Sequence, residues 1–163
     1  MKRIFYLFTI LLALVACEND DYFSTSPSLR LTFAVDTLPM DTVFSRTPSS
    51  TYAFWVHNTN DDGIRLSTVK LRRGNQSGLR VNVDGVYLDN SNGSQTNDVE
   101  IRKNDSILVF VELTATETRQ TAPQLVEDDL LFLLESGTVQ KVNLRAWAWD
   151  ARKVYDPVIT NDS

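Results

Sequence analysis

The amino-acid sequence predicts an all-β domain, an antiparallel β-sandwich of about 7–9 strands. Segments with an apolar side chain at every second position recur at a spacing of roughly 10 residues. Turn-forming residues separate these segments, and after the N-terminal leader we find no segment with the length and caps of a helix. Many short strands at this spacing are typical of two packed antiparallel sheets.

The first strand is predicted at residues 29–35, where apolar side chains alternate with polar or small ones. A short edge-like piece follows at Val43 and Phe44. The aromatic-rich segment 52–57 favours a strand. Another strand is expected at 64–71, after a cluster of turn-forming residues at 58–63.

Segment 79–83 alternates again and is followed by Asp84 and Gly85. Asp-Gly between two apolar runs is a strong hairpin signal, so residues 86–88 are expected to return beside 79–83. A polar loop is predicted over residues 89–97, followed by a brief strand marked by Val99 and Ile101.

The most regular strand pattern lies at residues 106–114. Both of its faces carry apolar side chains, which predicts a central strand. A loop is expected at 116–123, and then two strands at 125–135 and 139–149, joined by a turn at Ser136 and Gly137.

The N-terminus has the features of a secretory signal. Two basic residues precede an apolar run at 4–14, which is shorter than the roughly 20 residues of a membrane-spanning helix. The segment Leu14-Val15-Ala16-Cys17 resembles a bacterial lipobox, in which the cysteine thiol receives a diacylglycerol and becomes the new N-terminus. Two acyl chains suffice for stable anchoring. We therefore expect residues 1–16 to be a lipoprotein signal peptide and Cys17 to be the lipidation site.

An acidic tetrad follows the predicted lipidation site: Glu18, Asn19, Asp20 and Asp21. It resembles the surface-export signal of many Bacteroidetes lipoproteins, and the alternative is a solvated acidic linker. Residues 17–28 are expected to form the lipidated cysteine and a flexible tether, residues 29–150 the sandwich, and residues 151–163 a polar tail. The predicted location is the outer membrane, with the domain at the cell surface.

Composition limits the classes of function. Cleavage before Cys17 leaves 147 residues with 14 basic and 21 acidic side chains, a net charge of −7. This length fits one domain with a sufficient core, and this charge argues against a nucleic-acid partner. The one local basic cluster, formed by Lys70, Arg72 and Arg73, is interpreted as a solvated strand end. Because Cys17 is the only cysteine, the chain forms no internal disulfide.

Few residues suggest catalysis or metal binding. His57, the only histidine, lies at a strand end without a nucleophile motif nearby and is interpreted as a surface residue. Glu127, Asp128 and Asp129 could supply a pair of glycosidase carboxylates, but charges at the start of a strand usually face solvent or protect an edge. The oxygen-rich turn at 58–63 lacks EF-hand spacing and favours turns built on Asx side chains. No catalytic residue, metal or cofactor is expected.

Trp147 and Trp149 are two residues apart, so they project from the same face of their strand. If they are exposed, they form a stacking platform for sugars; otherwise they cover a sheet or pack against a neighbouring domain. Trp55 either joins them or lies in the core. Three short segments also resemble the Asp-Ser/Thr-apolar acceptor of O-glycosylation in Bacteroidetes, with acceptor residues Thr37, Thr42 and Ser106.

Several segments resemble the N-terminal domain of a group of Bacteroidetes lipoproteins: DTVF (41–44), SGLRVNVDG (77–85), DVEIR (98–102), DSILVFVE (105–112) and LRAWAWD (144–150). In that group the domain is immunoglobulin-like and is often followed by a right-handed parallel β-helix. The resemblance covers about residues 30–150 and implies an immunoglobulin-like sandwich without an assigned activity or catalytic residues. The sequence departs from the pattern by stopping soon after Asp150, where the β-helix would begin, as a truncated or a stand-alone form.

The sequence therefore predicts a lipid-anchored, surface-exposed interaction or structural module that is not an enzyme. Its expected partners are the membrane, through the diacylglycerol on Cys17, and another protein domain or a glycan. The first alternative is a glycan-binding lipoprotein that uses Trp147 and Trp149. The second is a carboxylate-based glycoside hydrolase or an accessory protein of one.

Overall fold

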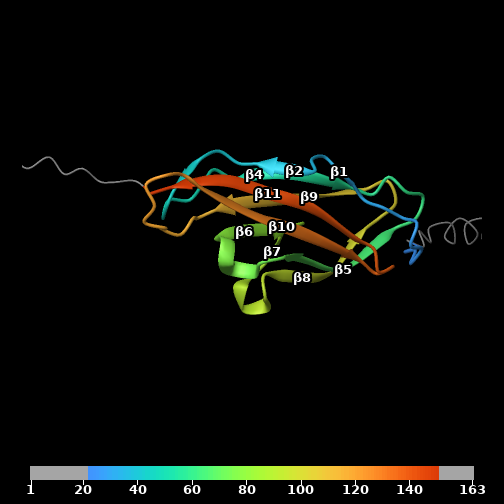
Figure 1. Cartoon of the computed structure of the whole chain (residues 1–163). Helices are drawn as coiled ribbons and strands as arrows, with labels where there is room; N and C mark the ends of the chain where they lie inside the picture. Colours follow the sequence, from blue (N-terminus) through green and yellow to red (C-terminus); the bar gives the residue numbers. More distant parts are fainter. Residues whose placement is uncertain (1–21, 151–163) are drawn as a thin grey trace, which may run out of the picture.

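A computed structural model describes residues 22–150 as a nearly all-β structure (Figure 1). The predicted signal peptide, Cys17, the acidic tetrad at 18–21 and the tail at 151–163 lie outside the described residues. No helix in the described part of the chain has the length and apolar character needed to cross a membrane.

Most strands lie where the alternation of apolar residues predicts them. The long strands at 52–57, 64–71 and 139–149 have the predicted bounds. In chain order the elements are β1 (Thr32–Phe33), β2 (Thr37–Pro39), β3 (Val43–Phe44), β4 (Tyr52–His57), β5 (Ile64–Leu71), η1 (Gly74–Ser77), β6 (Leu79–Val83), β7 (Val86–Tyr87), η2 (Asn90–Asn92), β8 (Gln95–Ile101), β9 (Ser106–Leu113), β10 (Gln124–Leu134) and β11 (Val139–Trp149).

The strands form two sheets that pack face to face. The first, termed the β9 sheet, has the order β1-β4-β9-β6-β7, and the second, termed the β11 sheet, has the order β2-β11-β10-β5-β8, with β3 also beside β11. All pairs of strands are antiparallel except those of β2 and β3 with β11, which are parallel. The sandwich is thereby confirmed, and so is the central position of β9 between β4 and β6.

The strand predicted at 29–35 is wrong in its extent, because only β1 (Thr32–Phe33) forms within it and β2 (Thr37–Pro39), which was not predicted, follows it. β1 pairs with β4 in one sheet, and β2 pairs with β11 in the other. Ala34 N donates to Trp55 O, and Asn143 N donates to Asp36 O, so the chain crosses between the sheets over this interval. With β3, residues 32–44 contain three short strands, and the eleven strands within residues 22–150 exceed the predicted number.

The hairpin predicted at Asp84 and Gly85 is confirmed. Val83 pairs with Val86 across a two-residue turn, and φ is 50° at Asp84 and 85° at Gly85, as a type I′ turn requires. The loop predicted over 89–97 is wrong at its end, because β8 already begins at Gln95 and pairs there with β5. The polar side chains of β8 hid this strand, which is an edge of its sheet.

The core lies between the two sheets and consists of the inward side chains of the long strands. The largest fully buried residues are Val56, Ile64, Leu66, Val69, Val81, Val83, Leu88, Ile101, Leu113, Leu130, Phe132 and Leu144. Burial of each such side chain stabilises the fold by about 1.5–3 kcal/mol. The core is therefore continuous along the length of the sandwich.

Part of the predicted tether lies against the sandwich. Phe23 forms a parallel β-bridge with Gly63, and Ser24 N donates to Gly63 O at 3.0 Å. The Arg65 guanidinium lies 4.9 Å from the centroid of the Phe23 ring. A Cβ atom at position 63 would lie only 2.7 Å from that ring, so the ring fits here because residue 63 is a glycine. Residues around Phe23 therefore belong to the folded domain and not to a flexible tether.

The described chain begins at one end of the sandwich and finishes at the other (Figure 1). Near the beginning, Arg30 Nη1 donates to Thr138 Oγ1, just before β11 starts. At the far end of β11, Ser45 N donates to Trp149 O. Because a strand rises about 3.3 Å per residue, β11 separates these two ends by about 30 Å or more.

Candidate interaction surface

The outer face of the β11 sheet carries the two tryptophans that the sequence analysis placed together. Side chains alternate along a strand, and the inward residues of β11 are Val142, Leu144, Ala146 and Ala148, all buried. The outward residues are Val139, Lys141, Asn143, Arg145, Trp147 and Trp149. Trp147 is 47% exposed and Trp149 is 45% exposed. Their shared face is thereby confirmed, and both side chains are about half exposed.

Two further apolar side chains join the tryptophans. Phe44 is in register with Trp149 across the parallel β3–β11 pair, and Leu125 is in register with Trp147 across the β10–β11 pair. Cross-strand neighbours in register have Cβ atoms about 5 Å apart. We term these four residues the aromatic band. All are about half exposed, and such a contiguous apolar surface is a mark of interaction sites.

Trp55 does not join this band and does not lie in the core, which corrects both predicted alternatives. It projects from the outer face of the β9 sheet, in register with Leu108. It is 46% exposed and stacks on His57, with ring centroids 6.4 Å apart. Trp55 is therefore an exposed tryptophan on the opposite side of the sandwich.

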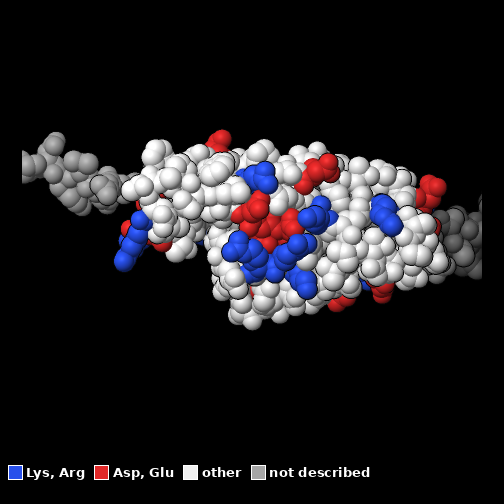
Figure 2. Space-filling view, in the orientation of Figure 1, with Lys and Arg blue, Asp and Glu red and all other residues white. Residues whose placement is uncertain are grey.

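Charged side chains occupy the same outer face, adjacent to the aromatic band. Figure 2 shows acidic groups enclosed by basic ones on this face. Asp129 pairs with Arg72 at 3.2 Å and with Lys141 at 3.1 Å, and Glu127 pairs with Arg145 at 3.0 Å. We term this set the charged cluster; its members are Lys70, Arg72, Arg73, Glu127, Asp129, Lys141 and Arg145.

The charged cluster corrects the interpretation of Lys70, Arg72 and Arg73 as an isolated strand end. Lys70 of β5 is in register with Leu131, an outward residue of β10, and Arg73 Nη1 donates to the Glu127 carbonyl at 3.3 Å. The register of β11, β10 and β5 thus places Lys141 and Arg145 on the same face as these three cations.

Asp129 is the most constrained carboxylate of the charged cluster. Its partial burial would raise its pKa, but hydrogen bonds from Asn143 and Lys141 and the charges of Lys141 and Arg72 outweigh that effect. The pKa of Asp129 is therefore lowered below its usual value. This carboxylate stays ionised at neutral pH and orients the cations around it.

Asp128 lies on the other side of the same strand, and its position contradicts the expectation that it faces solvent or protects an edge. It is 3% exposed and belongs to β10, between β11 and β5. Its carboxylate accepts hydrogen bonds from Arg73 N at 3.1 Å and Asp129 N at 2.8 Å. Ser77 Oγ also donates to it, at 3.4 Å. Burial is the largest influence and raises the pKa of Asp128.

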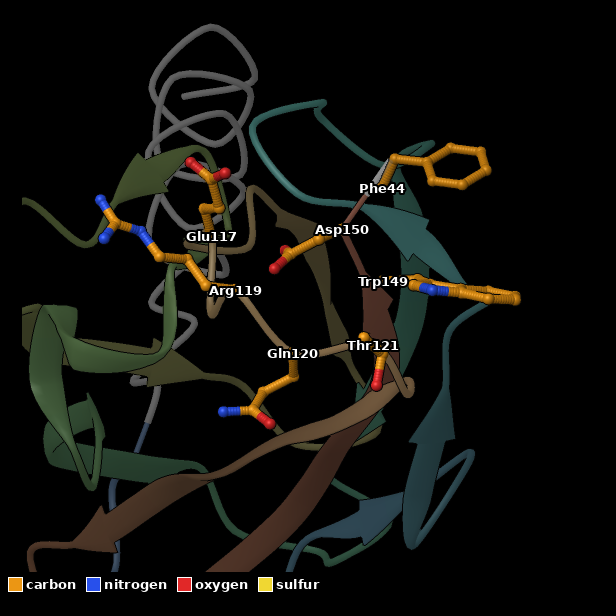
Figure 3. A pocket seen from close by; sticks show the side chains of 7 residues that line it. All are labelled: Phe44, Glu117, Arg119, Gln120, Thr121, Trp149 and Asp150. Atoms are coloured by element: carbon orange, nitrogen blue, oxygen red, sulfur yellow. The ribbon is translucent and has the colours of Figure 1, made fainter. Parts of the chain in front are cut away.

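A hollow of about 880 Å³ lies beside the aromatic band at the end of the sandwich. Its lining residues are Phe44, Glu117, Arg119, Gln120, Thr121, Trp149 and Asp150. In Figure 3 the rings of Phe44 and Trp149 point to one side, and the side chains of Glu117, Arg119 and Gln120 point to the other. The hollow is therefore open, with an aromatic side and a polar side.

The carboxylates of this hollow are engaged in holding the loop. Asp150 accepts a short hydrogen bond from Ser45 Oγ, and Thr118 N donates to it at 3.1 Å. The Ser45 hydrogen bond is the main cause of the lowered pKa of Asp150. Glu117 pairs with Arg46 at 2.6 Å. The contacts of Asp150 fasten the loop after β9 to the end of β11.

His57 and the turn at 58–63 lie outside the aromatic band and the charged cluster. His57 ends β4 and is in register with Ser106 on the outer face of the β9 sheet. The Asx interpretation of the 58–63 turn is confirmed, because buried Asn58 donates to the carbonyls of Asp62 and Ile101 and accepts from Asn60 N. Within residues 22–150 no group of three or more His, Cys, Asp or Glu side chains is arranged to hold a metal.

The predicted O-glycosylation acceptors are separated in the structure. Thr37 and Thr42 are exposed beside β11, at the start of β2 and just before β3. Ser106 is half-buried at the start of β9, in the other sheet.

The topology defines an immunoglobulin-like β-sandwich. The structure is similar to that of a protein of unknown function from Porphyromonas gingivalis W83, with a TM-score of 0.51 and 13% identity over 80% of this chain and 50% of that one. The chain thus spans about half the length of that structure. Because the identity is low, this likeness extends to the fold alone.

Two other solved structures show weaker likeness. The PapD-like domain 7 of human CEP192 gives a TM-score of 0.48 and 11% identity over 79% of this chain and 92% of that one. The CooA pilin subunit of enterotoxigenic Escherichia coli gives a TM-score of 0.47 and 13% identity over 77% of this chain and 100% of that one. No protein-family model and no curated protein sequence matches the chain.

Sequence reasoning did not find that Phe44, Leu125, Lys141 and Arg145 belong to this surface. Counting backwards from the predicted two-residue turn at Ser136 and Gly137 would have placed Leu125 opposite Ala148, one residue out of register. The turn in the structure has three residues, 135–137, and this shift places Leu125 opposite Trp147 and Glu127 opposite Arg145. Phe44 had no such local signal, because its parallel pairing with Trp149 joins segments more than 100 residues apart.

Proposed function

We propose that this chain is a lipid-anchored, surface-exposed interaction module that binds its partner through the outer face of the β11 sheet. The aromatic band carries this proposal. Phe44, Leu125, Trp147 and Trp149 come from three segments, meet on one face and remain between 43% and 55% exposed. Monomeric soluble proteins rarely leave large apolar side chains contiguous and uncovered, and such patches are typical of binding surfaces.

The placement of the band fits a chain that is anchored at its N-terminus. Cys17 would hold the chain five residues before Tyr22, where the described sandwich begins. β11 runs from that end to the opposite one, where Trp149 and Phe44 lie (Figure 1). An anchor at Cys17 would therefore present the band to the medium, away from the membrane.

The proposed module has no catalysis of its own. The carboxylates nearest the band are engaged in structural contacts, namely Asp150 with Ser45 and Thr118, and Glu127 with Arg145. The sandwich fold supports the proposed relationship to the Bacteroidetes lipoproteins whose N-terminal domain the sequence resembles.

A second candidate, glycan binding by Trp147 and Trp149, is favoured by a specific feature of the band. The two rings lie on one face two residues apart, or about 6.6 Å along the strand. Arg145 of β11 and Glu127 of β10 are in register with each other and form the outward pair next to Trp147 and Leu125. They supply hydrogen-bonding groups beside the apolar rings. A half-exposed aromatic platform with polar groups at its border suits a sugar ring, which has both an apolar face and hydroxyl groups.

The anchor is tested by metabolic labelling of cells with a palmitate analogue. The wild-type chain is expected to become labelled and to fractionate with membranes, and Cys17→Ser is expected to lose both properties. Protease treatment of intact cells then tests surface exposure, which should make the sandwich accessible. Labelling of the Cys17→Ser variant would contradict the anchor, and protection in intact cells would contradict surface exposure.

The binding surface is tested with a matched pair of tryptophan variants. A photo-cross-linking amino acid at position 147 is expected to give adducts in intact cells, and the same residue at position 55 is not. Trp55 suits the comparison because its exposure of 46% nearly equals that of Trp147, while it lies on the opposite sheet. Equal adducts at both positions, or adducts only at 55, would overturn the proposed surface.

Glycan binding is tested by affinity electrophoresis of residues 18–163, which contain the whole described sandwich. A polysaccharide in the gel should retard the wild-type chain and the Trp55→Ala variant, and the double variant Trp147→Ala/Trp149→Ala should migrate freely. Circular dichroism and urea unfolding confirm that the variants are folded. Retardation that survives the double substitution would exclude this platform.

A further inference from the structure

We propose that the outer face of the β11 sheet recognises an anionic polysaccharide. In this arrangement the aromatic band stacks on sugar rings while cations of the charged cluster pair with carboxylate or sulfate groups of the polymer. The inference rests on the glycan-binding candidate above and adds the chemical class of the glycan.

The first step is the charge of this face. The chain as a whole has a formal net charge of −5. Within the charged cluster, however, five cationic side chains surround two outward carboxylates, Glu127 and Asp129, which leaves an excess of three positive charges. Farther along β5, Arg65 is paired with Glu100 and Glu135. A local field opposite in sign to that of the whole chain attracts anions to this face in particular.

The second step is the availability of the cations. The side chains of Arg72, Lys141 and Arg145 are 57%, 55% and 51% exposed, although each pairs with a carboxylate. Arg145 uses Nε and Nη2 for Glu127, so its Nη1 is directed to no described acceptor. The pair of Arg145 and Glu127 is exposed on both sides and is therefore weak. Glu127 and Asp129 thus orient the cations without saturating them, and a bound anion can share them.

The third step is continuity between the two parts of the surface. Along the outward side of β11, Trp149 and Trp147 are followed by Arg145, Asn143 and Lys141. Trp149 and Lys141 are eight residues apart, or about 27 Å along the strand. A linear polymer lying along β11 would therefore meet stacking rings first and positive charges next. A small anion could not use both features at once.

The fourth step distinguishes this ligand from an anionic lipid surface, which would also attract tryptophan and basic residues. The aromatic end of β11 lies opposite the end where the described chain begins. A bilayer that holds Cys17 would lie near the end where the described chain begins, away from Trp147 and Trp149. The geometry thus favours a soluble or wall-attached polymer over the membrane itself.

The probes are two pectins with the same galacturonan backbone, one highly methyl-esterified and one de-esterified, and their affinities for residues 18–163 are measured by affinity electrophoresis. The de-esterified polymer is expected to bind at least about tenfold more tightly at low ionic strength, and the difference should narrow as salt screens the charges. Trp147→Ala/Trp149→Ala should weaken binding of both polymers.

The charge variants are matched in net charge. Lys70→Gln/Arg73→Gln removes two cations of the charged cluster, and the Arg73 side chain donates to the Glu127 carbonyl rather than to a carboxylate. Arg80→Gln/Lys103→Gln removes two cations elsewhere, one of them on the β9 sheet. The cluster variant should lose most of the preference for the de-esterified polymer, and the control should keep it.

The possible outcomes separate the two proposals. Equal affinity for both pectins, abolished by the tryptophan variant, would overturn the anionic preference and leave glycan binding standing. Binding of neither polymer would overturn the anionic-polysaccharide inference, whereas the glycan-binding candidate is decided by its own electrophoresis test. Equal losses in the two charge variants would show a non-specific charge effect and overturn the inference. Equally tight binding to phosphatidylglycerol vesicles, with the same variant pattern, would overturn it in favour of a lipid surface.

Discussion

Asp128 and Asp129 are consecutive residues of β10 whose carboxylates lie on opposite sides of the β11 sheet. Asp128 points into the interior and accepts hydrogen bonds from Arg73 N and Ser77 Oγ. Asp129 points outward and pairs with Lys141 and Arg72. Because side chains alternate along a strand, one aspartate holds the connection between β5 and β6, and the next organises the charged cluster.

Replacement of Asp128 should destabilise the fold. Asp128→Ala leaves three donors without their acceptor and is expected to lower the free energy of unfolding by about 1–3 kcal/mol. Asp128→Asn keeps an acceptor oxygen and should cost less. Urea unfolding at neutral pH measures both, with Asp61→Asn in an exposed turn as the control, expected within about 0.5 kcal/mol of wild type. Unchanged stability of Asp128→Ala would contradict the assigned role.

The two aspartates should give opposite pH dependences. The pKa of Asp129 is lowered in the folded state, so its contribution is present above the unfolded value, about 3.9, and is lost as pH falls through the folded value. The pKa of Asp128 is raised, so the folded state binds its proton more tightly and stability falls as pH rises from about 4 through the raised value.

The measurement is the free energy of unfolding of wild type, Asp128→Asn and Asp129→Asn between acidic and neutral pH. The cost of Asp129→Asn should shrink towards acid, whereas the cost of Asp128→Asn should be larger in acid than at neutral pH. Parallel profiles for the two variants would show that the opposite environments are not reflected in stability.

Gly78 should tolerate substitution less well than Gly137. Both have positive φ, 76° and 87°, so alanine at either position carries the left-handed backbone cost. A Cβ at Gly78 would also lie 2.3 Å from Thr114 O, while a Cβ at Gly137 meets nothing within 4 Å. Gly78→Ala is therefore expected to cost about 1–3 kcal/mol more than Gly137→Ala. Urea unfolding compares them, and equal costs would exclude the clash as a factor.

Gln140 should fasten the N-terminal segment to the sandwich. Its side chain accepts from Leu31 N at 2.8 Å and donates to Leu31 O at 2.9 Å, in place of a backbone pairing. Gln140→Ala is expected to speed amide hydrogen exchange around Leu31 at least tenfold, or by about 1.4 kcal/mol of local opening. Gln124→Ala is the control, because that side chain bonds only Ala122 O. Unchanged exchange at Leu31 would contradict this role.

Local pattern predicted the elements best where one strand lies wholly in one sheet. The bounds of β4, β5 and β11 follow from alternation, and the β6–β7 hairpin follows from Asp84 and Gly85. Residues 29–35 show the same alternation, but only Thr32 and Phe33 form a strand there, and no local signal marks the crossing to the other sheet that precedes β2. The inward direction of Asp128 was present in the pattern, since Val126, Leu130 and Phe132 share its parity, but the strand-end interpretation concealed it.

The all-β class, the position of most strands and the common face of Trp147 and Trp149 could be predicted from sequence, because these features depend on neighbours in the chain and on the two-residue period of a strand. The distant segments that complete this face could be identified only in the folded structure. The pairing of β3 with β11 brought Phe44 to Trp149, and the order β11-β10-β5 brought Lys141 and Arg145 to Arg72. Sheet order and register set such neighbours, and they arise from how the whole core closes rather than from any one segment.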